Sequence, residues 1–519
     1  MARAQEHEPT EARRSSPPPP APSAPSVPPV PSAPYEGCAP AARPGPGAGT
    51  SAPAAAEADG RPNRRRVLAR TGALGLGIAF TGNLSELFVG DAGARTFTGL
   101  GNDGYGPLVP DPQGLLDLPR GFRYRVLSRE GEPLRSGEGP VPGNHDGMAA
   151  FAGRSHHSGR THLVRNHENR ATAALPVPTV PGLTYDPMGK GGCTTLTLDR
   201  GHTVVDERVS LGGTAVNCAG GPTPWGTWLT CEETEDQAGT NGYTKDHGFV
   251  FEVDPVDPHR TGAEPLTAMG RFQHEAVAID PRDGIVYETE DAFRHPFGLF
   301  YRFLPARPRG GLGSLRAGGR LQAMRVPDVP DLSSVREAGA RFDGVEWVDV
   351  PDPLAVGTPV RHQDFGPAGI THAQKLEGCY WGGRCVYFVS SYARSREGSA
   401  ADHYGQIWRY DPRRARLTLV VVFGPDTDVQ LPGERPDNIC LAPGGGLMVC
   451  EDGGGGQHVY GVTRKGEVYA VARNRQDIGT PQEPDWGEFA GVTFSPRGGT
   501  MYVNCYTPGT TFAVTGPWR

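Results

Sequence analysis

A pattern of two short β-strands joined by a tight turn recurs six times along this chain and constrains its fold more than any other feature. In residues 275–291 and 437–452, an acid precedes a short alternating strand, a turn rich in Pro and Gly, a second β-rich strand and another acid. Residues 490–504 keep this frame without the first acid, and looser copies occupy 146–168, 218–232 and 377–390. Alternating apolar positions around such turns are typical of antiparallel hairpins, so we predict a β repeat protein.

Further strand-like segments follow several hairpins, as at residues 249–254 and 406–411. Four short strands per unit, repeated around an axis, are typical of a β-propeller, and the 74 Gly and 52 Pro suit its many turns. We therefore predict an all-β fold, a six-bladed β-propeller with inserted loops and short helices. The largest insertion lies within residues 305–359, and a pair of β-sandwiches is the alternative fold.

The first 94 residues differ in composition from the rest. Residues 1–60 are mostly Pro, Ala, Ser and Gly, which bury too little apolar surface to fold, so we predict a disordered leader. Residues 61–94 contain Arg64-Arg65, a short weakly apolar run and Ala92-Gly93-Ala94, a pattern typical of a twin-arginine signal peptide. A chance basic cluster before a core helix is the alternative. We expect export through the twin-arginine translocase, a secreted, extracellular or periplasmic location, and a folded domain over residues 95–519.

Charge and hydropathy exclude several classes of partner. The chain carries 51 Lys and Arg against 58 Asp and Glu, a net charge of -7, and has no basic stripe of the kind that binds nucleic acid. No segment after the signal is apolar enough for a bilayer span. We expect no nucleic-acid partner, no stable membrane span and a monomer.

Eight cysteines lie beyond the leader and show no CxxC zinc pattern. Two pairs, Cys379 with Cys385 and Cys440 with Cys450, are close enough in sequence to pair across a hairpin in an oxidising compartment.

The hairpin frame also places acids together. The start of the first strand and the end of the second share one edge of an antiparallel hairpin. The predicted neighbours are therefore Glu275 with Asp291, Asp437 with Asp452, Cys218 with Glu232, and Asp146 with Glu168. In a propeller these edges would face one mouth of the central channel and gather several carboxylates and one thiol there.

Carboxylates crowded in this way must either protonate or bind cations. Many oxygen ligands suit Ca²⁺, whereas a lone thiolate among carboxylates suits a transition ion such as iron. A solvated turn residue is the alternative interpretation for each acid taken singly. The sequence contains no HExxH, P-loop, GxSxG or DxDxDG motif.

Several longer motifs resemble those of a known family. They are residues 118–124 (LPRGFRY), 144–147 (NHDG), 163–168 (LVRNHE), 217–233 (NCAGGPTPWGTWLTCEE), 270–275 (GRFQHE), 435–438 (RPDN), 450–453 (CEDG) and 503–509 (VNCYTPG). Together they resemble the PhoX family of secreted alkaline phosphatases over nearly all of residues 100–519. The resemblance implies a six-bladed propeller exported by the twin-arginine route, with an iron and calcium centre, Fe(3+) and Ca(2+), that hydrolyses small-molecule phosphate esters.

Residue by residue, the resemblance implies specific roles. Cys218 resembles an iron-bound thiolate, with Glu232 and Glu275 as nearby carboxylate ligands. The acids that would complete the iron and calcium shells are Asp291, Glu377, Asp437, Glu290 and Glu168. Larger family members have Arg-Pro-Glu where this chain has Lys375-Leu376-Glu377. Lys375 is therefore the predicted catalytic contact to phosphate, acting as a point charge without the bidentate fork of arginine.

Two other functions remain open on the sequence alone. A calcium-dependent propeller could hydrolyse lactones or phosphodiesters at a single Ca²⁺, which needs three or four acids and no thiolate. A non-catalytic secreted propeller could bind a ligand or protein and use calcium only to stabilise its fold.

Overall fold

The structure is a computed structural model that describes residues 96–97, 104–154, 159–394, 401–424, 435–453, 455–480 and 483–519. The predicted leader over residues 1–60 and the predicted signal over 61–94 lie outside these residues. Among the described residues, no helix combines the length and apolar character needed to span a membrane.

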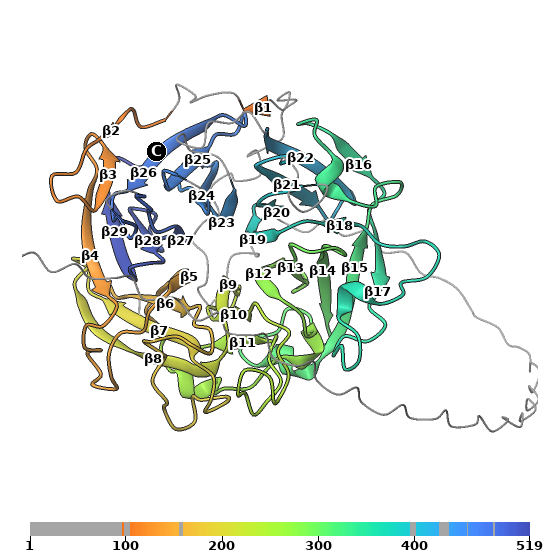
Figure 1. Cartoon of the computed structure of the whole chain (residues 1–519), viewed down its shortest axis with the longest axis horizontal. Coiled ribbons are helices and arrows are strands. Elements are labelled where there is room, and N and C mark those ends of the chain that lie inside the picture. Colours follow the sequence, from red (N-terminus) through yellow and green to blue (C-terminus); the bar gives the residue numbers. More distant parts are fainter. Residues whose placement is uncertain are drawn as a thin grey trace, which may run out of the picture. The chain divides into compact units, whose positions relative to one another are not determined.

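Six mainly antiparallel sheets surround a central axis in the described part of the chain (Figure 1), which makes the fold a six-bladed β-propeller and excludes a pair of sandwiches. Blade one contains β5 (His145–Ala152), β6 (Thr161–His167), β7 (Gly191–Leu198) and β8 (Val204–Thr214). Blade two contains β9 (Asn217–Pro222), β10 (Trp228–Glu232) and β11 (Val250–Val253). Blade three contains β12 (His274–Ile279), β13 (Val286–Glu290), β14 (Gly298–Pro305), β15 (Gly319–Arg325) and β17 (Glu346–Asp349), with β18 (His372–Ala373) paired to β14.

The other three blades follow in chain order. Blade four contains β19 (Leu376–Gly382), β20 (Cys385–Ser390), β21 (Gly405–Asp411) and β22 (Arg416–Phe423), with β1 (Thr96–Phe97) and β16 (Arg341–Asp343) paired to β22. Blade five contains β23 (Pro436–Leu441), β24 (Leu447–Glu451), β25 (His458–Val462), β26 (Val468–Asn474), β3 (Leu116–Pro119) and β2 (Leu108–Val109). Blade six contains β27 (Phe489–Phe494), β28 (Thr500–Cys505), β29 (Thr510–Thr515) and β4 (Arg123–Arg129).

The helices of the described residues are short 3-10 turns in the loops around blades two to four. They are η2 (Pro258–Arg260), η3 (Thr267–Met269), η4 (Ser314–Ala317), η5 (Leu332–Ser334) and η6 (Val360–His362). The predicted large insertion within residues 305–359 contains η4 and η5 together with strands β15, β16 and β17.

A strand from the beginning of the domain closes the ring. β4 precedes blade one in the sequence but forms the outermost strand of blade six, where it pairs with β29 in a register that places Val126 opposite Phe512. In blade five, β3 pairs with β26 in the same manner. Both ends of the domain are therefore tied into the last two blades, so no blade is left with a free radial edge at the junction.

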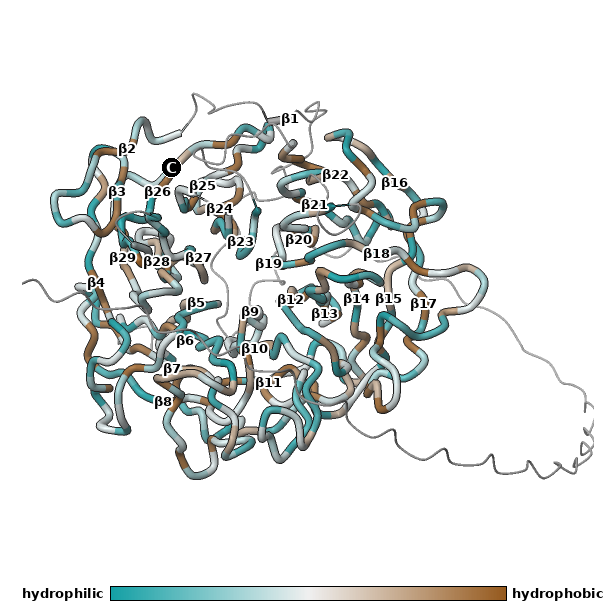
Figure 2. Tube along the Cα trace, viewed as in Figure 1, coloured by the Kyte–Doolittle hydropathy of each residue, from teal (hydrophilic) through white to brown (hydrophobic). Residues whose placement is uncertain are grey.

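The core consists of several clusters between blades, and Figure 2 shows hydrophobic segments in all six blades. Between blades three and four, for example, the rings of Phe300 and Phe388 stack with centroids 4.2 Å apart, and Trp408 is fully buried beside them. Each sheet thus buries both faces against its neighbours, which explains why most blade strands are buried along their whole length.

The cysteines beyond the leader are all free thiols, so neither of the two pairs that are close enough in sequence to bond across a hairpin does so. The strand register gives the reason. Cys385 lies opposite Gly382, while Cys379 lies opposite Phe388, and Cys440 lies opposite Met448 and not opposite Cys450.

Candidate metal centre at the propeller mouth

The innermost strand of each blade contains a β-bulge at the same place in its hairpin. In each case the register advances three residues on the inner strand against two on its partner, as from His274 opposite Glu290 to Val277 opposite Glu288. The bulged pairs are Asp146-Gly147, Cys218-Ala219, Glu275-Ala276, Glu377-Gly378, Asp437-Asn438 and Gly491-Val492. A bulge changes the direction of side chains along its strand. The first residue of each pair is an acid or a cysteine in every blade except the sixth.

The second residue of each pair lines the central channel, and most of these residues are small. A Cβ atom on Gly147 would lie 2.5 Å from the Cα of Ala219, and one on Gly378 would lie 2.5 Å from the carbonyl oxygen of Asp437. Neighbouring inner strands therefore touch through their backbones. This close approach brings the first residues of adjacent bulges within reach of a common ion.

Side chains from adjacent blades hold the bulges in place. The Nδ2 of Asn504 donates to the carbonyl of Asp146 at 2.5 Å, and the Nδ2 of Asn166 donates to the carbonyl of Cys218 at 3.0 Å. The hydroxyl of Thr289 donates to the carbonyl of Glu377 at 2.7 Å. Because each bond joins one blade to the next, the ligand positions are fixed relative to one another before any ion binds.

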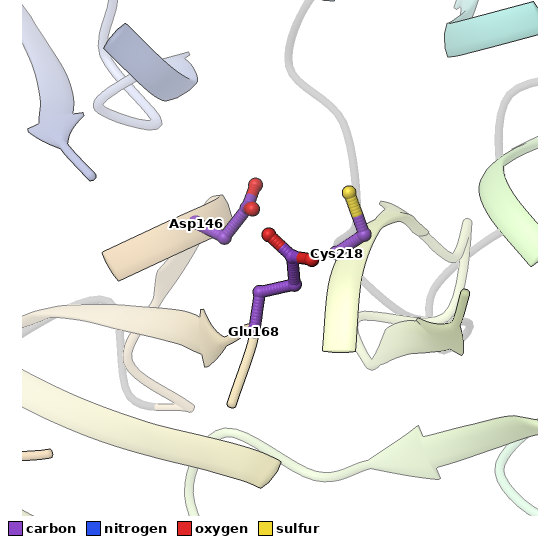
Figure 3. Close-up of side chains that lie close together, drawn as sticks. All are labelled: Asp146, Glu168 and Cys218. Atoms are coloured by element: carbon purple, nitrogen blue, oxygen red, sulfur yellow. The ribbon is translucent and has the colours of Figure 1, made fainter. Parts of the chain in front are cut away.

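Three overlapping groups of potential metal ligands result. Within each group the ligand atoms lie within 4.8 Å of one another, and the groups are Asp146 with Glu168 and Cys218, Cys218 with Glu233 and Glu275, and Glu275 with Glu377 and Asp437. Figure 3 shows the first group, whose three side chains point toward one another. Cys218 and Glu275 each belong to two groups, so the arrangement suits adjoining cations that share ligands.

The electrostatics of the mouth require cations or protons. Both carboxylate oxygens of Glu275 are buried without a hydrogen-bond partner, and burial, then the charges of Glu377 and Asp437, raise the pKa of Glu275 well above its usual range. Burial, then Asp146 and Glu275, likewise raise the pKa of the Cys218 thiol well above normal. Buried carboxylates without partners are strongly unfavourable when ionised. A donor set of thiolate and carboxylates, as in the two groups that contain Cys218, fits iron, and the oxygen-only group of Glu275, Glu377 and Asp437 fits calcium.

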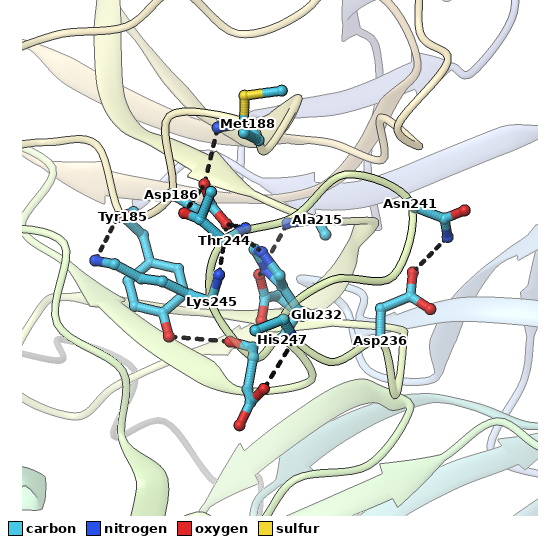
Figure 4. Close-up of polar contacts among 12 residues, drawn as sticks. Tyr185, Asp186, Met188, Ala215, Glu232, Asp236, Asn241, Thr244, Lys245 and His247 are labelled. Atoms are coloured by element: carbon cyan, nitrogen blue, oxygen red, sulfur yellow. Dashed lines mark hydrogen bonds and ion pairs between the residues drawn. The ribbon is translucent and has the colours of Figure 1, made fainter.

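Glu232, one of the predicted ligands, is replaced in these groups by Glu233. The oxygens of Glu232 accept hydrogen bonds from His247 Nδ1 at 2.6 Å and from the backbone amides of Ala215, Gly248 and Phe249 at 2.8 to 3.0 Å. His247 Nε2 in turn lies 3.5 Å from Asp186, which completes a buried network beside the mouth (Figure 4). The side chains of Glu232 and Glu233 therefore lie in different environments. The predicted ligand, Glu232, is the one whose carboxylate oxygens already accept hydrogen bonds from the protein.

Glu290 is also absent from the ligand groups, for a similar reason. Its Oε1 lies 3.0 Å from Arg361 Nη1, and its Oε2 accepts a hydrogen bond from the Tyr301 hydroxyl at 2.6 Å. The next residue, Asp291, faces the mouth instead. Its Oδ1 is buried without a partner, and the charge of Lys375 and a hydrogen bond with Glu233 partly offset the rise in its pKa that burial causes.

Two cations face the acids from opposite sides of the mouth. Lys375 Nζ lies 2.5 Å from Glu377 Oε1 and 3.5 Å from Asp452 Oδ2, and Arg170 Nη2 lies 2.8 Å from Glu168 Oε1. Burial opposes the charged form of Lys375, but the carboxylates of Glu377, Asp291 and Asp452 overcome it and raise its pKa well above normal. Lys375 is therefore a charged ammonium inside the site.

Some residues of the mouth were not predicted as ligands at all. Besides Glu233, they include Asp146, which the hairpin frame placed there, and Glu488, whose carboxyl shares a hydrogen bond with Asp452. Glu488 precedes the inner strand of blade six, the blade whose bulge begins with Gly491. The repeat in blade six lacks its first acid, and this gap in the pattern is the sequence feature that could have directed attention to a nearby acid such as Glu488.

The family model described as alkaline phosphatase PhoX matches residues 103–509. Comparison with the curated proteins finds no relative by sequence. Among solved structures, Pseudomonas fluorescens PhoX in complex with vanadate is similar with a TM-score of 0.56 and 18% identity, over 78% of this chain and 96% of that chain. A gluconolactonase from Xanthomonas campestris has a TM-score of 0.36 and 14% identity, over 79% of this chain and 98% of that one.

The metal-free protein is expected to lose stability as pH rises through the neutral range. Burial, then Asp452, raises the pKa of Asp437 from 3.8 to about 8, so the folded state keeps a proton that the unfolded state releases. This contribution is complete below the unfolded pKa and is lost as pH rises through about 8. Urea unfolding of chelator-treated protein at about pH 5 and about pH 9 measures the effect, and readdition of metal should restore stability at the higher pH. Equal stability of the metal-free protein at both pH values would contradict it.

Substitution of the adjacent residues Glu232 and Glu233, one at a time, should separate an effect on folding stability from an effect on metal binding. Glu232→Gln leaves buried donors and His247 without their carboxylate and should lower the free energy of unfolding by about 3 kcal/mol or more. Glu233→Gln removes a like charge from the mouth, so the metal-free protein should keep its stability while the bound metal content falls. Denaturant unfolding and elemental analysis of both variants measure the two effects. A loss of metal with Glu232→Gln alone would restore the original prediction.

Proposed function

The chain belongs to the PhoX family of alkaline phosphatases, and on that basis we propose that this phosphatase hydrolyses phosphate monoesters with metal ions bound by the acids and thiol of the propeller mouth. The observation that carries the proposal is the set of overlapping ligand groups joined by Cys218 and Glu275. The similar Pseudomonas structure contains vanadate, a transition state analogue, and this supports the same class of reaction for a mouth built on the same fold.

Specific residues would hold the metals. Cys218, Glu233 and Glu275 offer a thiolate and carboxylates suited to Fe(3+), while Asp146 with Glu168, and Glu377 with Asp437, offer the oxygen ligands that Ca(2+) prefers. Asp291 lies beside them with a free buried oxygen. When bound, such cations supply Lewis acidity and neutralise the charge that builds up on the phosphate oxygens during transfer.

Lys375 is the residue that we propose to contact the phosphate. Its backbone adopts a φ of 50°. Two backbone hydrogen bonds hold this conformation: the Lys375 N–H donates to the Ala292 carbonyl at 3.4 Å, and the Ser391 N–H donates to the Lys375 carbonyl at 2.8 Å. This conformation is uncommon for a residue with a side chain and is typical of functional positions. The side chain is 23% exposed, so the ammonium can keep its contact to Glu377 and still donate to an entering anion.

The position of the ammonium gives it a role in orientation. A lysine attracts phosphate as a point charge, and the two carboxylates beside it fix where that charge lies. A phosphate placed between Lys375 and the cations of the mouth would have its oxygens neutralised from both sides. Held in this way, the ester presents one face to attack and its alcohol group to the opposite side.

Export from the cytoplasm would bring the enzyme to its substrate. We propose that the twin-arginine translocase exports the chain through the signal over residues 61–94, and that the mature enzyme acts as a monomer outside the cytoplasm on small phosphate esters. The sequence of the signal region supports this proposal. A calcium-only lactonase or a non-catalytic propeller would leave the Cys218 thiol among the acids without a use.

Cys218→Ala should reduce both the iron content and the activity of the enzyme. Loss of a shared ligand should lower kcat/KM for a generic phosphomonoester by about 100-fold or more, since even indirect partners of a metal contribute 10 to 100-fold. Elemental analysis and hydrolysis assays on metal-loaded protein, before and after chelation, measure both effects. Cys385→Ala is the matched control, because Cys385 lies at the β19–β20 turn and belongs to none of the ligand groups. Full activity of Cys218→Ala would favour a calcium-only hydrolase.

Lys375→Met should weaken the enzyme without emptying the metal centre. The substitution keeps the length of the side chain but removes its charge, so kcat/KM should fall by roughly 100-fold, about the value of one charge-assisted contact of 2 to 3 kcal/mol. Lys375→Arg should recover part of the activity, because arginine restores the charge. Metal content measured in parallel shows whether the loss is one of phosphate binding. Unchanged kcat/KM in Lys375→Met would remove Lys375 from the proposed site.

A further inference from the structure

One part of the mouth rim contains two arginines that form no ion pair with any acid among the described residues. We call it the arginine–tyrosine platform and define it as Phe293, Tyr392, Arg394 and Arg435. Its residues come from the ends of mouth elements: Phe293 follows Asp291, Tyr392 and Arg394 follow β20, and Arg435 precedes β23. The platform therefore draws on blades three, four and five, the same blades that supply Glu275, Glu377 and Asp437.

The platform is built around the ring of Tyr392. The guanidinium carbons of Arg394 and Arg435 each lie 5.0 Å from the centroid of this ring. Arg394 Nη2 also donates to the Tyr392 hydroxyl at 2.6 Å, and the ring of Phe293 stacks with that of Tyr392 at a centroid distance of 6.2 Å. Tyr392 is buried, whereas the Phe293 residue is 40% exposed, so the platform has one face toward solvent.

Hydrogen bonds fix the platform beside Lys375. The side chain of Gln374 donates to the Phe293 carbonyl at 3.0 Å and accepts from the Arg394 amide at 2.8 Å. The Arg435 carbonyl accepts from the amide of Asp452, and the Asp452 carboxylate lies 3.5 Å from Lys375 Nζ. The platform and the proposed phosphate contact thus share the same short backbone segments and adjoin one another.

Among the described residues, the two arginines differ from the other cations of the mouth in forming no ion pair. Lys375 and Arg170 are ion-paired, as is the neighbouring Arg361. Within the part of the chain that the structure describes, Arg394 and Arg435 form no ion pair, and the Nε atom of each is buried without a hydrogen-bond partner. Two guanidinium groups on one ring repel each other, and an anion near both would relieve this repulsion and satisfy their free donors.

We propose that the arginine–tyrosine platform binds an anionic group on the alcohol side of the substrate. This inference rests on the proposed phosphatase function and narrows its substrates to phosphate monoesters that carry a second anion, either a carboxylate or another phosphate. Lys375 and the metal ions would hold the phosphate that is cleaved, while the platform would hold the second anion. The planar, multiply donating guanidinium groups suit both kinds of anion.

The test compares esters that differ in this second group. 3-Phosphoglycerate and glycerol 3-phosphate differ by a carboxylate in place of an alcohol, and fructose 1,6-bisphosphate and fructose 6-phosphate differ by a phosphate. For the metal-loaded wild-type enzyme, kcat/KM should be at least tenfold higher for the member of one or both pairs that carries the second anionic group. Which pair shows the preference distinguishes a carboxylate from a phosphate as the second anion.

Arg394→Gln should reduce this preference about tenfold, mainly through a higher KM for the ester with the second anion. Arg435→Gln should act in the same direction, and Arg497→Gln, in the exposed turn between β27 and β28, is the control for loss of a positive charge. Thermal unfolding and metal content show that each variant is folded and loaded. A wild-type preference near one, or a preference unchanged in both platform variants, would overturn the proposal while leaving the phosphatase function in place.

If the loaded wild-type enzyme hydrolyses none of these esters, it is the proposed phosphatase function that fails. Calorimetry with the wild type and with Arg394→Gln then measures the binding of 3-phosphoglycerate and of fructose 1,6-bisphosphate. This measurement tests anion binding by the platform independently of catalysis. Binding that weakens in Arg394→Gln supports the platform, and equal or absent binding of both probes overturns it.

Discussion

Repulsion among buried like charges is the constraint on which the rest of this structure depends. Glu275 sits at its centre, with two buried oxygens that contact no donor and with Glu377 and Asp437 nearby. Hydrogen bonds from adjacent blades to the bulge carbonyls hold these acids close together, and so do the small residues that line the channel. The ammonium of Lys375 offsets only part of the repulsion among the acids. The arrangement is favourable only when cations or protons compensate the charge of the acids.

The fold was accessible from the sequence because its signal is local. Each hairpin carries its own alternation and its own turn, and the repeated frame predicts that Cys218, Glu275 and Asp437 lie at one mouth. The family resemblance adds Glu377. The choice between Glu232 and Glu233 was not accessible in this way. It depends on the partners that long loops bring to each carboxylate, such as His247 on one side, and the hairpin pattern carries no information about those loops.

The same limit explains why the arginine–tyrosine platform was missed. Tyr392, Arg394 and Arg435 lie just outside the repeated strands, in connections whose spacing differs from blade to blade. No periodic signal marks them. Arg394 and Arg435 stand out because they form no ion pair among the described residues. A sequence cannot show this, because it does not give the positions of the surrounding acids or of their partners.

The closure of the ring by β4 has a consequence for the order of events during synthesis. β4 emerges early from the ribosome but cannot find its neighbour until β29, within the last residues of the chain, has been made. The ligand groups, in contrast, draw only on blades one to five and the loops beside them, so all of their residues are made before blade six is complete. A nascent chain interrupted before its final strand would therefore hold every residue of the three ligand groups, yet its ring would stay open because β4 would have no partner strand.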